Sequence, residues 1–152
     1  MYTLVLLIHS WLRYVALAAG IAATVTPLVD RSETLHGGRA DRWGLVLMIV
    51  LDVQMLLGLL LYLALSPVTR AAMDDFGAAM KNPAVRFFAV EHVTLMFAAV
   101  FLAHLGRVLA RKARTPDAKR MRMLMCAGLA TLAMLLAIPW PWMAGGRPLF
   151  RV

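Results

Sequence analysis

The chain has 152 residues, of which 62% are hydrophobic and 16% charged, and its formal net charge is +8. Soluble domains average about 45–50% apolar and about 25% charged residues, so a soluble chain of this length could not bury so much apolar surface. The apolar residues form long runs and not alternating segments of about ten residues, which excludes a transmembrane β-barrel. We therefore expect an all-α membrane protein, because only helices and closed barrels satisfy their backbone groups in lipid.

Four apolar runs are long enough to cross a hydrocarbon core, which takes about 17–25 residues of helix. In chain order they cover residues 4–28, 43–65, 87–105 and 123–138. Glycines and prolines separate the runs, among them Gly37, Pro67, Pro83 and Pro116. The expected fold is a four-helix transmembrane bundle in which residues 1–152 form a single transmembrane domain.

Lysine and arginine set the expected orientation, because short connections rich in these residues resist translocation. Three of them lie in residues 30–42 and seven in residues 107–122, whereas the two termini and residues 66–86 together hold five. Both termini are therefore predicted to be non-cytoplasmic. The basic connections are interpreted as a topology signal that also contacts anionic lipid, and no nucleic-acid partner is expected.

Polar side chains inside the predicted spans are the main functional signal, because a charged group there costs about 2.5–3.5 kcal/mol on insertion scales and normally faces the bundle interior. They are His9 and Arg13 in the first span, Asp52 and Gln54 in the second, and Glu91, His92 and His104 in the third. We therefore expect a polar interior between the first three helices.

Depth in the membrane predicts which of these side chains meet, since a helix rises about 1.5 Å per residue. His9 and His92 both come out roughly 7 Å below the outer boundary on different helices, so they can face each other. Arg13 and Asp52 both come out near the midplane. We expect these two to form an ion pair, because a paired buried charge costs far less than an isolated one.

Two histidines at one depth on two helices are the arrangement by which membrane b-type cytochromes hold haem, with one imidazole on each axial face of the iron. Ala99 and Ala103 follow His92 on or near the same face of its helix, and small side chains there would leave a slot for the planar ring. The leading prediction is therefore one haem b ligated by His9 and His92 in the outer half of the bundle.

Two other interpretations of the histidines stay open. His9 and His92 could satisfy only interhelical hydrogen bonds, as polar residues in membrane bundles often do. They could also bind a non-haem metal together with Glu91 or Asp52, since carboxylates and imidazoles are common metal ligands.

A second haem, toward the other membrane face, would need His104 and another imidazole, for which His36 is the only candidate. His104 follows His92 by twelve residues, which places it about 120° around the helix and argues against two haems stacked on one face. His36 lies in a glycine-containing connection and is expected to be solvated.

Four short motifs resemble those of small four-span bacterial membrane proteins that are often labelled cytochrome b or cytochrome-b-like. They are IHSWLRY in the first span, DVQMLLGLLLY in the second, RFFAVEHVTLMF in the third and the closing IPWP. The resemblance covers most of the chain and implies haem binding in the bacterial inner membrane. Asp52 is one departure, because a histidine is common at this position in these proteins.

The resemblance points to six site residues in an electron-transfer protein or subunit that exchanges electrons with quinol or a partner cytochrome. They are His9 and His92 as axial metal ligands, Arg13 and Arg86 as charge partners of the haem propionates, and Gln54 and Glu91 as supporting or quinone-contacting groups. The alternative is an accessory subunit without chemistry in a larger respiratory or photosynthetic complex. A homo-oligomer is a further candidate arrangement, and whether any reaction is catalysed is left open.

Overall fold

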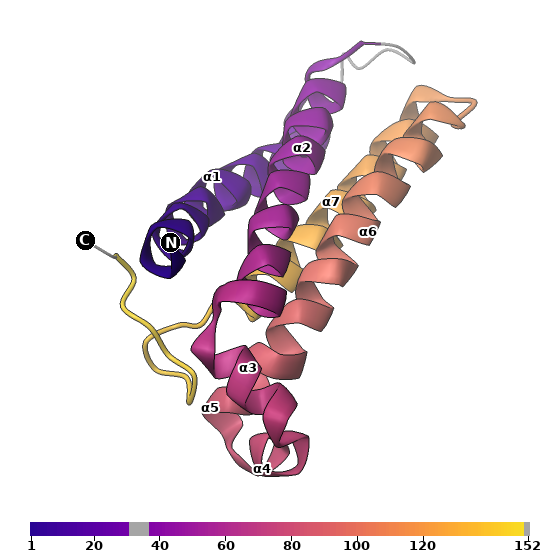
Figure 1. The fold of residues 1–152 in the computed structure, drawn as a ribbon. Helices are drawn as coiled ribbons and strands as arrows, with labels where there is room; N and C mark the ends of the chain where they lie inside the picture. Colours follow the sequence, from indigo (N-terminus) through magenta and orange to yellow (C-terminus); the bar gives the residue numbers. More distant parts are fainter. Residues whose placement is uncertain (31–36, 151–152) are drawn as a thin grey trace.

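The computed structural model describes residues 1–30 and 37–150, and this part of the chain is helical without a strand (Figure 1). Four helical spans are long and apolar enough to cross a membrane, which is consistent with a multi-pass membrane protein. They are α1 (Tyr2–Val29), α2 (Arg39–Leu60) with the π-helical η1 (Leu61–Leu65), α5 (Pro83–Arg86) with the π-helical η2 (Phe87–Glu91) and α6 (His92–Arg111), and α7 (Pro116–Ala137). The expected all-α four-helix bundle is confirmed.

The spans are longer than the apolar runs, chiefly at the end where α2 and α7 begin and α6 ends. The predicted bounds stop where charged residues begin, because hydrocarbon excludes charge, but a helix in the interfacial region has no such limit. Thr115 caps α7 by accepting a hydrogen bond from the Ala118 amide, and Pro116 occupies the first helical position, where it needs no N–H partner.

Residues 66–86 are not a simple loop but include two further short helices, α3 (Pro67–Asp74) and α4 (Phe76–Lys81). A polar side chain begins each helical segment here, and it accepts a hydrogen bond from a backbone amide of the first turn. The caps are Ser66 before α3, Asp75 before α4 and Asn82 before α5. The connection therefore folds into a compact helical cap beside the ends of α2 and α6 (Figure 1).

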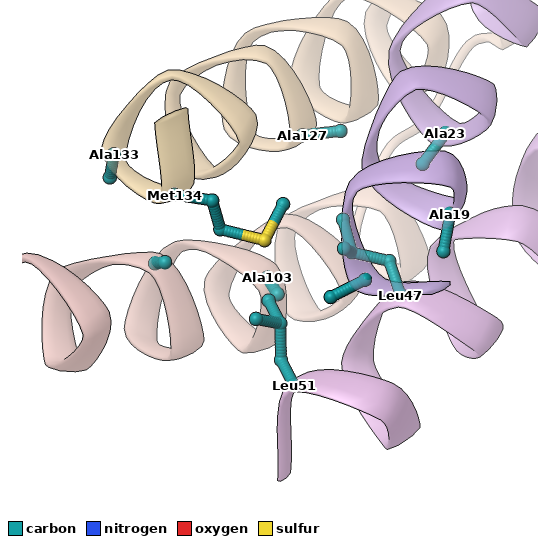
Figure 2. Packing of buried hydrophobic residues seen from close by; sticks show 10 residues of the cluster. Ala19, Ala23, Leu47, Leu51, Ala103, Ala127, Ala133 and Met134 are labelled. Atoms are coloured by element: carbon teal, nitrogen blue, oxygen red, sulfur yellow. The ribbon is translucent and has the colours of Figure 1, made fainter. Parts of the chain in front are cut away.

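The four spans form a ring in which α1 packs on α2 and α7, and α6 packs on the same two helices. The core between them is made largely of alanine with a few larger side chains, such as Leu47, Leu51 and Met134 (Figure 2). Ala19 and Ala23 have small side chains, so the backbone of α1 can approach the neighbouring helices closely. Small residues at contacts are typical of helix packing in membranes, where van der Waals contact drives association.

Basic residues at the end of the bundle opposite the cap hold α2, α6 and α7 together. Lys119 is 1% exposed and forms an ion pair with Asp41 at 2.5 Å, while Arg107 donates to the Asp41 carbonyl at 2.9 Å. Arg122 donates to the Leu109 carbonyl at 2.8 Å. Several residues that we interpreted as a topology signal and a contact for anionic lipid therefore also join the helices. Arg31, counted in the same signal, lies outside the described residues.

Close contact between α6 and α7 gives the first prediction. A Cβ atom placed on Gly106 would lie 2.7 Å from Cβ of Cys126, which is shorter than any ordinary carbon contact. Gly106→Ala should therefore force the two helices apart and lower the free energy of unfolding by about 1–3 kcal/mol. Unfolding in detergent micelles, followed by circular dichroism, measures this change.

Gly128→Ala is the matched control, because its added Cβ would meet Cγ2 of Thr24 at 3.6 Å, an ordinary van der Waals distance. This variant should be neutral or gain up to about 1 kcal/mol from the higher helix propensity of alanine. Equal stability of the two alanine variants would show that the α6–α7 packing is wrong.

Candidate ligand-binding site

A cavity opens between the helices at the end of the bundle where α1 begins and α7 ends. The cavity has an empty volume of about 1040 Å³, which includes the part that is open to the outside. Its walls come from α1, α2 with η1, the start of α3, η2 with α6, and the end of α7. Every spanning segment thus contributes to one cavity, which is the arrangement of cofactor sites in helical bundles.

His9 of α1 and His92 of α6 face each other across this cavity. Their ring centroids are 6.3 Å apart and their planes are inclined by 66°. The prediction that equal depth brings these two side chains together is therefore confirmed. A metal–imidazole bond is about 2 Å long and the ring centre lies about 1 Å behind the nitrogen, so two imidazoles that share a metal have centres about 6 Å apart.

The His92 ring is fixed by a hydrogen bond from Nδ1 to the carbonyl oxygen of Ala137, at 2.7 Å. A carbonyl oxygen only accepts, so Nδ1 carries the proton and Nε2 keeps its lone pair. Phe87 and Phe88 pack on the same ring, with centroids 6.0 and 6.2 Å away. A backbone carbonyl on the second nitrogen is the usual support of a metal-ligating histidine.

The Ala137 carbonyl is available to His92 because α7 ends at a proline motif. In a continuing helix this oxygen would accept from the amide four residues later, but that residue is Pro141, which has no N–H. The Leu135 carbonyl loses its partner to Pro139 in the same way, and the indole N–H of Trp140 takes it at 2.9 Å. The IPWP motif thus frees two carbonyls and supplies one of them to the site.

A π-helical turn precedes His92. In η2 a backbone N–H donates to the carbonyl five residues earlier, as His92 does to Phe87. The turn therefore holds one extra residue, and it rotates the segment before it relative to the helix after it. A second such turn, η1, ends the α2 span next to the same cavity. π-Helical turns are rare and are often found at functional sites. No periodicity in the two apolar runs indicates either turn.

His9 is held by Gln54, whose Nε2 donates to the His9 carbonyl at 3.0 Å and lies 3.5 Å from His9 Nε2. Gly58 lies beside the His9 ring, and a Cβ there would come within 3.2 Å of Cε1. Three buried polar atoms around this point have no hydrogen-bond partner within the described part of the chain, namely His9 Nδ1, Arg13 Nε and Gln54 Oε1. An unpaired buried polar group costs about 1–3 kcal/mol, so this cluster indicates a site for a bound molecule.

The predicted ion pair between Arg13 and Asp52 is wrong. Arg13 faces the cavity and donates to the Tyr14 hydroxyl at 2.9 Å and to the Leu149 carbonyl. Asp52 lies on the side of α2 that faces away from the cavity, and its Oδ1 is 2.8 Å from His104 Nε2. Equal depth is necessary for two side chains to meet, but it does not determine the direction in which a side chain points around the helix axis.

Arg86 and Glu91 do not line the cavity, contrary to the roles predicted for them. They form an ion pair with each other at 2.8 Å, and both side chains are well exposed. Their spacing of five residues across η2 brings them together, whereas a regular α-helix would favour a spacing of three or four. Of the six predicted site residues, the cavity therefore contains His9, Arg13, Gln54 and His92.

The three-ligand metal site is also not formed. No group of three or more histidine, cysteine, aspartate or glutamate side chains comes together within residues 1–30 and 37–150. Glu91 is occupied by Arg86, and Asp52 by His104. His104 lies on the outside of the bundle and away from the cavity, and His36, its predicted partner for a second haem, lies outside the described residues.

Ala99 and Ala103 do not border the cavity, although we expected them to leave its slot. Both are buried in the helix core, where Ala103 lies with Leu51 of α2 (Figure 2). The physical reason is distance along α6, because Ala99 lies about two turns beyond His92 and Met96 is the last residue of this helix that lines the cavity. Small residues that do line the cavity include Gly58 and Ala16.

Arg147 is a charged cavity residue that sequence reasoning did not place at the site. It belongs to the irregular segment after α7, where its amide donates to the Pro139 carbonyl at 3.1 Å. Its guanidinium lies 5.3 Å from the centre of the Phe88 ring, within the range of a cation–π contact. The residue follows the last apolar run by nine residues, and the turn after the IPWP motif folds it back.

The Asp52 and His104 contact gives the second prediction. In a double-mutant cycle, Asp52→Asn and His104→Gln should show a coupling of about 0.5–1.5 kcal/mol in unfolding free energy, as polar contacts between membrane helices do. Asp52→Asn and Arg13→Met should instead be additive within about 0.5 kcal/mol, because they share no contact. Coupling between Arg13 and Asp52 would restore the rejected ion pair.

The cavity thus combines two facing imidazoles and two arginines with walls that are otherwise mainly apolar, such as Leu6, Leu17 and Met96. Its polar groups come from α1, α2, α6 and the segment after α7, so they meet only in the folded bundle. In comparisons with family models, with curated proteins and with solved structures, no match to this chain was found.

Proposed function

We propose that the cavity binds haem b between His9 and His92 and that the protein transfers electrons in a membrane. The observation that carries this proposal is the separation of the two rings, 6.3 Å between centroids, on two helices that face one cavity. It is the separation expected for two imidazoles that share one metal atom, since each bond is about 2 Å long. The resemblance of four motifs to cytochrome-b-like membrane proteins supports the same function.

The donor atoms fit an iron with two protein ligands. His92 keeps Nε2 free because Nδ1 is bound to the Ala137 carbonyl. His9 Nδ1 is buried without a partner within the described residues, and it would bind iron in the tautomer that has its proton on Nε2, which gives up the 3.5 Å contact with the Gln54 amide. Neutral imidazoles are suitable iron ligands because their lone pairs need no deprotonation at neutral pH. The cavity also has the apolar walls and convergent polar groups that are typical of cofactor sites.

The charge of the cavity fits a ligand with acidic groups. Arg13 and Arg147 both line it, and neither forms an ion pair with a carboxylate within the described part of the chain. Two arginines without acidic partners leave the cavity with positive charge, which favours an apolar molecule bearing carboxylates. Haem b has an apolar macrocycle and two propionates, so Arg147 takes the role that we predicted for Arg86.

Bound haem would supply a metal that gains and loses one electron. His9 and His92 would hold the iron, the Ala137 carbonyl would orient His92, and Arg13 and Arg147 would meet the acidic groups of the ligand. An iron held by both histidines would have no open position for oxygen, which favours electron transfer over oxygen chemistry. The cavity lies at one end of the bundle, so quinol or a partner cytochrome could exchange electrons there.

We further propose that the protein lies in a bacterial inner membrane with both termini on the non-cytoplasmic side. The asymmetry of lysine and arginine supports this orientation. The cavity, which lies where α1 begins and α7 ends, would then open toward the non-cytoplasmic face.

The ligand prediction is tested by the absorption spectrum of the protein purified from cells supplied with haem. The wild type should show a Soret band and a sharp α band on reduction. His9→Ala and His92→Ala should each remove the haem or make it high-spin, because one axial ligand is lost. His104→Ala is the control and should keep the native spectrum, since His104 lies outside the cavity. A colourless wild type, or native spectra in both ligand variants, would favour the accessory-subunit alternative.

The arginine prediction concerns affinity and reduction potential. Arg13→Gln and Arg147→Gln should each weaken haem binding by about tenfold, the effect of losing one hydrogen bond to a charged group. Each should also lower the midpoint potential, because removing a positive charge near the iron disfavours the added electron. Arg70→Gln, an exposed arginine bound to the Ala64 carbonyl outside the cavity, is the control. Optical titration of haem into the haem-free protein measures the affinity, and an optical redox titration measures the midpoint potential. An unchanged potential in Arg13→Gln and Arg147→Gln would contradict the placement.

A further inference from the structure

A polar pair lies on the outer surface of the bundle, within the span of the helices. Asp52 Oδ1 of α2 and His104 Nε2 of α6 are 2.8 Å apart, and their side chains are 40% and 47% exposed. Asp52 is thirteen residues from either end of the Arg39–Leu65 span, which is about 20 Å of helix in both directions. A monomer in a membrane would therefore present a carboxylate to hydrocarbon near its midplane.

Such exposure is unfavourable and unusual. An aspartate at the centre of a membrane helix costs about 2.5–3.5 kcal/mol on insertion scales, and ionisable groups at this depth almost always face protein or a water-filled cavity. The residues around the pair offer no such shelter, because Leu56 and Phe101, one turn away on α2 and α6, are themselves exposed and apolar. The surface formed by these four residues, here called the α2–α6 face, is thus suited to protein contact.

We infer that the α2–α6 face binds a second copy of this chain. Copies of one chain insert with the same orientation, so a dimer in a membrane has its twofold axis along the membrane normal, and the same face meets itself. Asp52 and His104 touch within one copy and therefore lie at one depth. A rotation about the membrane normal preserves depth, so the second copy brings the same carboxylate and imidazole to the same level.

Charge complementarity is the reason to choose a second copy over another subunit. The α2–α6 face carries the Asp52 carboxylate and the His104 imidazole, so the carboxylate of each copy can meet the imidazole of the other. The apolar side chains around the pair would pack against each other and exclude lipid. An unrelated subunit would need its own polar group at this depth, whereas a second copy necessarily brings one. The inference does not depend on which molecule occupies the cavity.

Disulfide cross-linking in native membranes tests the inference. The only cysteine of the chain, Cys126, is buried between α6 and α7, so the unaltered protein is the baseline. Leu56→Cys and Phe101→Cys, after mild oxidation, should give a species of twice the chain mass. Val15→Cys on α1 and Leu129→Cys on α7 are controls of comparable exposure, 51% and 49%, and should stay monomeric.

Three results would overturn the inference. Equal cross-linking at all four positions would indicate random collision, and no cross-linking at Leu56→Cys or Phe101→Cys would indicate that lipid covers the face. A cross-link to a different protein would identify another subunit as the occupant.

The role of the polar pair is tested by adding Asp52→Leu and His104→Leu to the Phe101→Cys chain. Removing polar contacts between helices should reduce dimer association by about tenfold, measured as the cross-linked fraction at a series of protein-to-lipid ratios. An unchanged fraction would show that the pair does not hold the two copies together.

Discussion

The hydrogen bond from His92 to the Ala137 carbonyl is the interaction on which the proposed site depends. It joins the start of α6 to the end of α7, and it fixes which nitrogen of the imidazole is free. Two features of the sequence make it possible. Pro141 withdraws the amide that would otherwise take the carbonyl, and Phe87 and Phe88 of η2 pack on the His92 ring. The orientation of the His92 imidazole in the cavity thus depends on how α7 ends.

The two polar regions within the spans have opposite orientations and, in our account, opposite purposes. The cavity gathers His9, His92 and Arg13 toward the bundle interior, where a bound molecule can partner them. The contact of Asp52 with His104 faces outward, where only another protein can shelter it from lipid. Both follow from one constraint, that hydrocarbon offers no hydrogen bonds to polar groups.

The sequence predicts the fold well because length and hydropathy are sufficient for it. Backbone groups in lipid must be satisfied within the helix, so an apolar run of the right length has little choice of structure. The facing of His9 and His92 was predictable for a related reason, since both helices run in the same direction from the same boundary and depth follows from residue counting.

Rotation about a helix axis could not be predicted in the same way. Asp52 matches Arg13 in depth but points away from it, and the π-helical turn gives Arg86 and Glu91 a contact with each other instead of with the cavity. Arg147 was missed because an irregular segment carries it, and no periodicity describes how such a segment folds back. Side-chain direction depends on the packing of all four spans, which a single sequence pattern does not contain.

The central claim is that one metal atom joins α1 and α6 through His9 and His92. Pulsed electron paramagnetic resonance on oxidised, haem-loaded protein that carries ¹⁵N-labelled histidine tests it most directly. Our account predicts strong coupling of the iron to nitrogens of two histidines, and of only one in a His9→Ala protein that retains haem. Coupling to a single histidine nitrogen in the wild type, or to none, would contradict it.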